Sequence, residues 1–395
     1  MTSKKKIIGD MILNVIAASI PVAVLQLIIY PITAKAIGGD NYGLMLTIYS
    51  IWIMISNSLG NVLNNVRLLY NEEYCQNHIK GDFMVLFKRW SIVNTLAMCV
   101  AIIFYCKQFS ILHVVLGVIV SLLIITKAYT EVGFRLVLNY KAIVVNNILQ
   151  SIGFLIGTII TVRTGIWETI FILGYLFSSI YCIVKTKLIF ETSTKTKIFK
   201  KVSGDTNKLI IASIISNMMN YADKLILYPL MGGYSVSIYY TATILGKIIG
   251  MLTGPINSVI LSYISRWNHN KKNLLNKVLL LGVVVVILGY IITLLISKPI
   301  IGILFPQWQE EVLYYMPVTT VTVLLLALIS IIQPFILKFC EMKWQIVINS
   351  IGVVIYFSCS LIFWKMFGLM GFCVGTAVGT LSKLIIMLVV YYKYK

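Results

Sequence analysis

The sequence predicts an all-α polytopic membrane protein with about twelve transmembrane helices, and three observations support this. Hydrophobic residues make up 59% of the chain and charged residues 12%, whereas a soluble domain has roughly 45–50% and 25%. Apolar runs follow one another at about the 20-residue length that lets a helix cross roughly 30 Å of hydrocarbon. The segments between these runs are alternately rich and poor in lysine.

Six of the expected spans precede a long polar segment and six follow it. The first six are expected at residues 11–34, 42–66, 91–105, 109–126, 143–162 and 166–184. The second six are expected at residues 209–230, 236–264, 278–296, 312–337, 345–364 and 369–391. The polar segment, residues 185–208, is expected to be a cytoplasmic linker. The predicted domains are therefore an N-terminal six-helix lobe at 1–184 and a C-terminal six-helix lobe at 209–395.

The distribution of positive charge sets the expected orientation. Of the 33 lysines and arginines, 25 fall in segments on one side of the expected spans, 5 on the other side and 3 inside spans. Cytoplasmic loops of membrane proteins carry the excess of positive charge. Both termini are therefore expected in the cytoplasm, with the protein in an inner membrane.

Several functional classes lack their sequence signatures. The net charge of +20 is spread over seven cytoplasmic segments without an aromatic platform, so anionic lipid headgroups are favoured as partners over nucleic acid. The chain has no GxxxxGK[ST] loop, which argues against an ATP engine of the P-loop type. The cysteines form no CxxC pair and the three histidines are isolated from one another. We therefore expect no metal, no cofactor and no catalytic residue.

A short pattern recurs at the outer ends of the first and seventh spans. In both places Tyr-Pro is followed by Gly-Gly and then by a further tyrosine. The first copy is Tyr30, Pro31, Gly38, Gly39 and Tyr42, and the second is Tyr228, Pro229, Gly232, Gly233 and Tyr239. Because both exits are expected on the same side, the lobes are predicted to be parallel repeats related by an axis along the membrane normal.

Polar side chains follow one face of three expected spans, the second, the seventh and the eighth, at helical intervals. In the second span they are Asn57, Gly60, Asn61, Asn64 and Asn65. In the seventh span they are Ser213, Ser216, Asn217, Asn220, Asp223 and Lys224. Lipid cannot satisfy such groups, so each face must contact other helices or a water-filled cavity. The spacing alone leaves both interpretations open.

Three lysines lie inside expected spans, where a functional role is the default expectation for an ionisable residue. Lys247 is about eleven residues into the eighth span, which is roughly 16 Å at about 1.5 Å per residue. Lys224 is near the outer end of the seventh span. Lys383 is near the cytoplasmic end of the twelfth, where a snorkelling anchor is an equally good interpretation.

Asp223 is the acidic residue nearest to these lysines in the pattern. It is adjacent to Lys224 and therefore about 100° away around a helix. We therefore do not expect it to pair with its neighbour. It is a candidate partner for Lys247 or Lys383 instead.

The segments around spans 1 and 2 and around spans 7 and 8 resemble a known family. The first is IPVAVLQLIIYPITAKAIGGDNYGLMLTIYSIW and the second is NMMNYADKLILYPLMGGYSVSIYYTATILGKIIGML. Each has a proline near the end of a helix, a glycine turn and a tyrosine a few residues on, and the second also has an acidic-basic pair. With the size, twelve spans and cytoplasmic termini, this is similar to polysaccharide flippases of the multidrug/oligosaccharidyl-lipid/polysaccharide exporter superfamily. The length and composition are most similar to bacterial O-antigen flippases.

The resemblance implies transport of an undecaprenyl-pyrophosphate-linked oligosaccharide from the cytoplasmic to the periplasmic leaflet of a bacterial inner membrane, by alternating access. It also implies a central cavity lined by spans 1, 2, 7 and 8, in which lysines face the pyrophosphate and amides face the sugar. The candidate cavity residues are Lys247, Lys224, Lys383, Asp223, Asn217, Asn220, Asn57, Asn61 and Asn64. Coupling to an H⁺ or Na⁺ gradient is an open option, with Asp223 as the nearest candidate. A polymerase and a chain-length regulator of the same pathway are candidate partners.

Two alternatives remain. Another secondary carrier, such as a multidrug or facilitator-type exporter, can also have twelve spans, but the segment after the second span lacks the Gly-x-x-x-Asp-Arg-x-Gly-Arg-Arg type turn of the facilitator class. Cationic cavity residues also suit an anionic cargo better than a cationic drug. A membrane glycan polymerase or ligase is disfavoured because the longest expected outer segment, residues 298–311, is too short to hold a catalytic domain.

Overall fold

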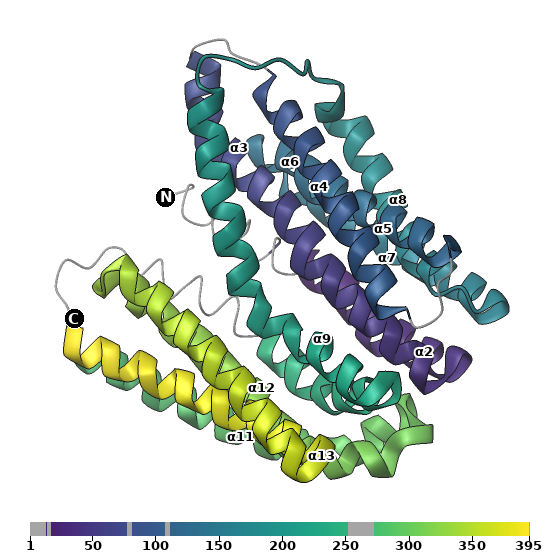
Figure 1. Ribbon diagram of the computed structural model, residues 1–395, viewed down its shortest axis with the longest axis vertical. Helices are drawn as coiled ribbons and strands as arrows, with labels where there is room; N and C mark the ends of the chain where they lie inside the picture. Colours follow the sequence, from purple (N-terminus) through teal and green to yellow (C-terminus); the bar gives the residue numbers. More distant parts are fainter. Residues whose placement is uncertain (1–12, 14–16, 77–80, 107–110, 252–271, 395) are drawn as a thin grey trace. The chain divides into compact units, whose positions relative to one another are not determined.

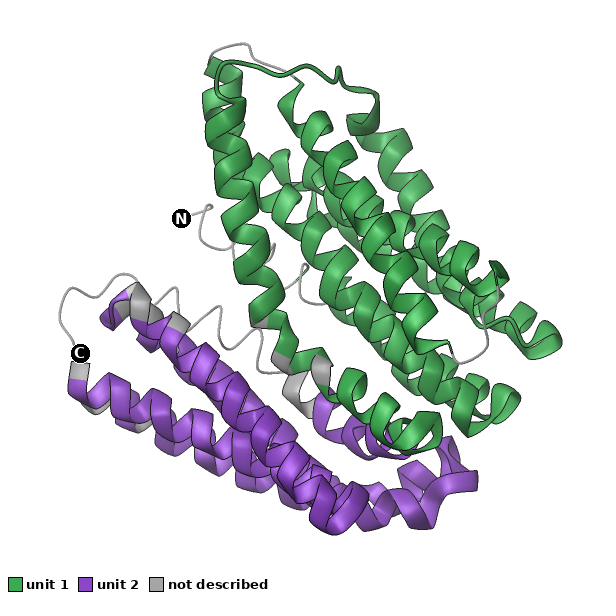
Figure 2. Ribbon diagram, viewed as in Figure 1, with its two compact units in different colours: residues 1–236 green, residues 237–395 purple. Residues whose placement is uncertain are grey.

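The structure is a computed structural model that describes residue 13 and residues 17–76, 81–106, 111–251 and 272–394 (Figure 1). Within these ranges the chain is helical and contains no strand, which confirms the all-α fold class. The helices form two compact units, Met1–Val236 and Ser237–Lys395 (Figure 2). The boundary between the units falls inside a helix and not in the segment 185–208, so the division into two six-helix lobes stays a prediction.

Consecutive helices make up both units. The first unit contains η1 (Leu25–Ile29), α2 (Tyr30–Trp52), η2 (Ile53–Asn57), α3 (Ser58–Gln76), α4 (Asp82–Tyr105), α5 (Ile111–Thr130), α6 (Val132–Leu136), α7 (Tyr140–Thr164), α8 (Glu168–Thr186), η3 (Leu188–Phe190) and most of α9 (Phe199–Met251). The second unit contains the rest of α9, α11 (Lys272–Leu304), η4 (Pro306–Trp308), α12 (Gln309–Phe339) and α13 (Met342–Tyr394).

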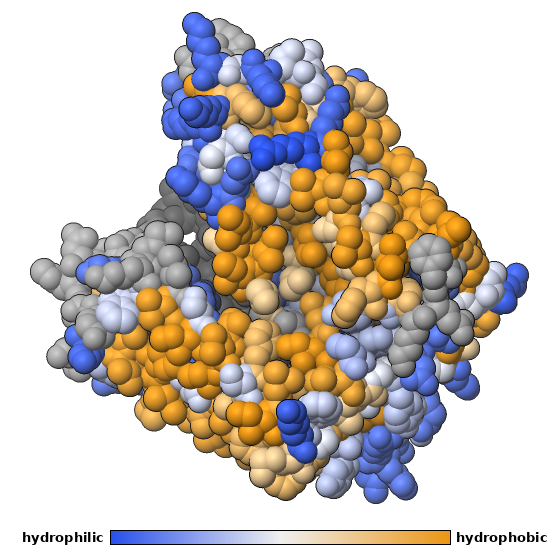
Figure 3. Space-filling view, viewed as in Figure 1, coloured by the Kyte–Doolittle hydropathy of each residue, from blue (hydrophilic) through white to orange (hydrophobic). Residues whose placement is uncertain are grey.

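The described helices are those of a multi-pass membrane protein, since eight of them are long and apolar enough to cross a bilayer. Two of the eight, Ala17–Gln76 with 60 residues and Val347–Lys393 with 47, each cover two expected spans. The seventh expected span and residues 236–251 of the eighth lie in α9, and residues 252–264 of the eighth lie outside the described residues. Figure 3 shows hydrophobic residues over the flanks of the helices and hydrophilic residues around the end of the first unit that carries the linker. The count of twelve and the orientation stay predictions.

Small residues let neighbouring helices approach closely in both units, as is common in membrane bundles. A Cβ atom at Gly60 of α3 would lie 2.5 Å from the Ala128 Cβ of α5. In the second unit α13 folds back on itself at Gly368, and a Cβ at Gly375 would lie 2.6 Å from the Cys359 carbonyl oxygen. The glycines therefore mark contacts that a larger side chain would push apart.

The two copies of the Tyr-Pro and Gly-Gly pattern break their helices in the same way. In α2, Gly38 has φ 78° and ψ 168°, and in α9, Gly232 has φ 81° and ψ 179°. Residues other than glycine rarely adopt this backbone conformation. The matching backbone geometry agrees with the internal repeat expected from the sequence.

The linker is fastened to the first unit at two points. Glu191 accepts two hydrogen bonds from the Arg67 guanidinium of α3, with N–O distances of 2.7 and 2.6 Å. Further along, the Thr196 backbone N–H donates to Asp82 Oδ1 at 2.7 Å, and the Tyr74 hydroxyl donates to Asp82 Oδ2 at 2.6 Å. These contacts hold the segment between α8 and α9 as a strap across one end of the unit.

Candidate functional site

The first part of α9 runs antiparallel to α3. Near its start, the Tyr70 hydroxyl donates to Asp205 Oδ2 at 2.6 Å. Three turns further along α9, Asn217 Nδ2 donates to Ser58 Oγ at 2.8 Å. The residue numbers of the contacts increase along α9 while they decrease along α3. The two helices therefore share a long contact that includes polar side chains of both.

The same packing continues to the end of the first unit opposite the linker, where α9 meets α2. A Cβ atom at Gly43 would overlap the carbonyl oxygen of Gly233, and one at Gly233 would overlap the carbonyl oxygen of Asp40. The Tyr234 backbone N–H donates to Asp40 Oδ1 at 3.1 Å. The turns that follow the two repeated glycine breaks therefore touch through their backbones.

Four of the predicted cavity residues lie on the two segments that this contact brings together, and we call them the polar seam. They are Asn57 at the end of η2, Asn61 of α3, and Asn217 and Asn220 of α9. Asn57 and Asn61 are half-buried, Asn220 is exposed, and Asn217 is half-buried with its amide bonded to Ser58. The seam can therefore exchange hydrogen bonds with a polar molecule at the surface of the first unit.

Asn64 lies elsewhere on α3. Its side chain is 1% exposed, and its Nδ2 donates to the Ala128 carbonyl oxygen of α5 at 3.0 Å. This is the interhelical hydrogen bond that the spacing left open as one of two interpretations. In this structure Asn64 joins α3 to α5, next to the close approach of Gly60.

The expectation that Asp223 does not pair with Lys224 is wrong. Lys224 Nζ lies 2.9 Å from Asp223 Oδ1, and the two side chains are 4% and 9% exposed. The Lys224 backbone N–H donates to the same oxygen at 2.8 Å. The angular argument failed because the four-carbon lysine stem is flexible enough to bring its ammonium back to the preceding residue. The pair joins opposite charges within α9.

The second unit holds the other two predicted cations. Lys247 is half-buried in the last part of α9, and its Nζ lies 4.2 Å from the centre of the Tyr240 ring, in a cation–π arrangement. Lys383 is half-buried in α13, where its aliphatic stem packs against Gly352. Both lysines are thus embedded in helices of the second unit, as their position in the sequence predicts.

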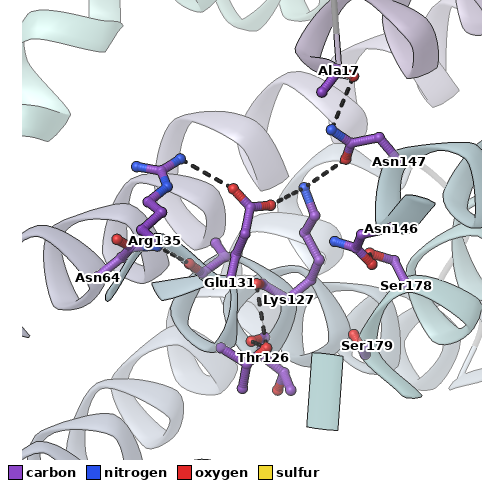
Figure 4. A network of polar contacts seen from close by, with 12 residues as sticks. Ala17, Asn64, Thr126, Lys127, Glu131, Arg135, Asn146, Asn147, Ser178 and Ser179 are labelled. Carbon is purple, nitrogen blue, oxygen red and sulfur yellow. Dashed lines mark hydrogen bonds and ion pairs between the residues drawn. The ribbon is translucent and has the colours of Figure 1, made fainter. Parts of the chain in front are cut away.

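The first unit also contains a network of charged side chains that the sequence did not lead us to expect (Figure 4). Glu131 bridges Lys127 at 3.0 Å and Arg135 at 3.1 Å, and its side chain is only 8% exposed. Lys127 also donates to Asn147 of α7 at 3.4 Å, and Asn147 donates to the Ala17 carbonyl at 2.9 Å. The spacing of four residues between the charges is the signal that could have revealed it. The network ties α5 and α7 to the start of the chain's described helices.

The polar groups described above are amides, hydroxyls, carboxylates, ammonium groups and guanidinium groups. In the described part of the chain, no three histidine, cysteine or acidic side chains come together as a possible metal site. The cysteines described there are all free thiols. The amides of the polar seam can form hydrogen bonds, and the ammonium groups of Lys224, Lys247 and Lys383 lie at buried or half-buried positions. Groups of these kinds suit recognition of a hydrated anionic molecule.

Comparison with solved structures identifies the fold. The chain is similar to lipid II flippase MurJ in an inward closed conformation, with a TM-score of 0.72 and 14% identity over 99% of this chain and 87% of that one. It is also similar to a multidrug resistance MATE family transporter of the MOP superfamily in an inward-facing conformation, with a TM-score of 0.65 and 12% identity over 96% and 97% of the two chains.

A MATE structure in complex with MaD5 gives a TM-score of 0.64 at 13% identity, over 98% of this chain and 95% of that one. These structural similarities confirm the fold of the exporter superfamily that the sequence resemblance led us to expect. No protein-family model and no curated protein sequence matches the chain.

Proposed function

We propose that this protein, which has the fold of a multidrug/oligosaccharidyl-lipid/polysaccharide exporter, is a flippase for a lipid-linked oligosaccharide. The observation that carries the proposal is the combination of an amide-rich polar seam and embedded lysines in membrane helices of that fold. A sugar diphosphate is anionic and strongly hydrated, so a path through the bilayer must replace its hydration with hydrogen bonds and fixed positive charge. The seam offers the former. Lys247 and Lys383 are the main candidates for the latter, because the charge of Lys224 is balanced by Asp223.

The specific cargo we propose is an undecaprenyl-pyrophosphate-linked O-antigen repeat unit, moved from the cytoplasmic to the periplasmic leaflet of a bacterial inner membrane. The sugar and diphosphate would follow the polar path while the lipid tail stays in the bilayer. Alternating access would proceed by movement of one half of the molecule against the other. A polymerase and a chain-length regulator are the partners we expect to receive the product.

The energy source belongs to this proposal as well. We keep coupling to an H⁺ or Na⁺ gradient as part of it. The contact between Asp223 and Lys224 supports a structural role for this carboxylate, because an ammonium at 2.9 Å already satisfies it. Asp223 is therefore a weaker candidate for an ion-coupling residue than the sequence alone suggests.

The experiment that tests the class of activity is deletion of the gene. A flippase mutant should accumulate lipid-linked repeat units in the cytoplasmic leaflet and make no long surface polymer. Reintroducing the intact gene should remove the accumulation and restore the polymer. Single repeat units reaching the surface without chain extension would support a polymerase instead.

A second candidate, a multidrug exporter, is favoured by the similarity to the MATE transporters. That alternative predicts greater sensitivity to cationic drugs after deletion, with normal surface polymer. The two results separate the candidates because the first changes a glycan and the second changes drug tolerance.

Lys247 tests the proposal at the level of a residue. Lys247→Ala should abolish transport at normal protein abundance, because the offset for the diphosphate charge is lost, and Lys247→Glu should be worse. Lys247→Arg should keep partial transport, since it keeps the charge. Full complementation by Lys247→Ala at wild-type expression would remove this residue from the proposed path.

A further inference from the structure

A histidine and a glutamate meet at the end of the first unit that lies opposite the linker. His113 Nδ1 of α5 lies 2.5 Å from Glu168 Oε1 of α8. Both residues occupy the first turn of their helix, so the contact joins the two helix starts. The partners are 55 residues apart in the sequence, and for this reason the spacing of polar residues did not reveal them.

The glutamate is deeply buried while the histidine is accessible. The Glu168 side chain is 1% exposed and the His113 side chain 35%. Among the described residues, Glu168 Oε2 has no hydrogen-bond partner. A buried carboxylate needs compensation, because an isolated ionised group is costly in a low-dielectric site. The imidazole supplies that compensation on one oxygen only.

Aromatic rings enclose the pair. The Trp167 ring stacks on the His113 ring with a centroid distance of 6.3 Å and an interplanar angle of 12°. The Trp52 ring of α2 packs on Trp167 at 5.8 Å. With the rings packed beside the pair, the imidazole is its accessible part and the carboxylate its buried part.

Cys106, the residue that follows α4, is a further titratable group near the pair. Burial, and then the charge of Glu168, raise the pKa of the Cys106 thiol. The thiol therefore stays protonated near neutral pH and adds no charge. From α2 the neighbouring side chain is the uncharged Trp52. Of these described groups, His113 and Glu168 are the two that can carry charge near neutral pH.

We propose that His113 and Glu168 form a proton-binding site at this end of the first unit. With the proton bound, an imidazolium faces a carboxylate and the helix starts are joined by an ion pair. Without it, a neutral imidazole donates a single hydrogen bond and the pair carries one negative charge. Proton occupancy therefore changes how firmly α5 and α8 are held together. In the proposed topology the site faces the periplasm, but its existence does not depend on the cargo.

The stacked tryptophan provides a direct test. A protonated imidazole quenches an adjacent indole more strongly than a neutral one, so intrinsic fluorescence of the purified full-length protein should show a step between about pH 5 and about pH 9. Trp167→Phe and His113→Gln should each remove the step. Glu168→Gln should keep it and move its midpoint. His78→Gln, a change at another of the three histidines, should leave step and midpoint unchanged.

NMR of the wild-type protein with labelled histidine gives a second measurement that needs no altered core residue. The His113 signal, identified by its loss in the His113→Gln spectrum, should titrate in the same range with the midpoint of the fluorescence step. A step that persists in His113→Gln would overturn the proposal. A His113 signal that does not change across the range, or a midpoint unaffected by Glu168→Gln, would mean a fixed structural contact and would also overturn it.

Discussion

The two ends of the first unit are closed by different kinds of contact. At the linker end, multiple charged groups meet: Glu191 takes both nitrogens of Arg67, and Asp82 holds the linker through Thr196 and Tyr74. At the opposite end, α2 and α9 touch through glycine backbones and one backbone hydrogen bond to Asp40. The linker is held by directional ionic contacts, whereas the contact between α2 and α9 depends on close fit, beside the separate ionic contact of His113 and Glu168 at the same end. The contact between α2 and α9 is therefore the one that an added side-chain atom would disturb most.

The largest effect is expected between the two ends, at the Asp223–Lys224 pair. Asp223→Ala should lower the amount of folded protein in the membrane, because stranding a buried ammonium costs about 3–5 kcal/mol. Replacing both residues, as in Asp223→Leu with Lys224→Met, should cost less than the single change. Abundance by immunoblot and thermal unfolding are the measurements. Equal abundance of the single variant and wild type would show that this pair matters less than either end.

The next largest effect is expected at the glycine contact. Gly43→Ala should destabilise the protein by roughly 1–3 kcal/mol, because its Cβ overlaps the Gly233 carbonyl oxygen and forces α2 from α9. It should also impair transport. Gly204→Ala in the same α9 helix is the matched control, since nothing lies within 4 Å of a Cβ there. Similar unfolding midpoints for both variants would contradict the view that this end depends on close fit.

A smaller effect is expected from the linker strap. Glu191→Gln should reduce the unfolding free energy by about 1–2 kcal/mol, because it weakens charged hydrogen bonds to a guanidinium that is 11% exposed. Lys201→Ala breaks a contact to Glu73 whose two side chains are 58% and 36% exposed, so its effect should be below about 1 kcal/mol. Thermal unfolding of the two variants in the same detergent compares them. An equal loss in both would place the strap among ordinary surface contacts.

The smallest effect on stability is expected within the polar seam. Asn217→Ala removes one hydrogen bond to Ser58 and should cost about 1 kcal/mol. Asn220→Ala, three residues along the same face and exposed, should leave stability unchanged. If the seam contacts cargo, both changes should reduce transport. A transport defect confined to Asn217→Ala would assign the seam to helix packing alone.

Local patterns in the sequence predicted the fold well, and the site less completely. The apolar runs predicted the helices, and the repeated Tyr-Pro and Gly-Gly pattern marked the two breaks at Gly38 and Gly232 because only glycine tolerates that backbone. The spacing of asparagines located polar faces but could not say which neighbour each would meet, so Asn64 turned out to bond to α5. Helical angle alone misjudged Lys224, whose stem reaches past its own position.

Contacts between distant residues had no local signal. Arg67 and Glu191 are 124 residues apart, and their bidentate contact depends on where the linker passes over α3. The sequence assigned Arg67 to topology and the linker to a simple connection. The folded helices bring these two groups together, so their contact could not be predicted from the spacing of residues in the sequence.

Because the linker is held at two separate points, the chain can be cut between them. Glu191 and Thr196 are held separately, and the residues between them include the exposed Thr192 and Ser193. A break after Ser193 would leave each anchor on its own polypeptide, with the antiparallel contact between α3 and α9 still available to join them. Two separately synthesised fragments, 1–193 and 194–395, should therefore find each other in the membrane without a covalent tether.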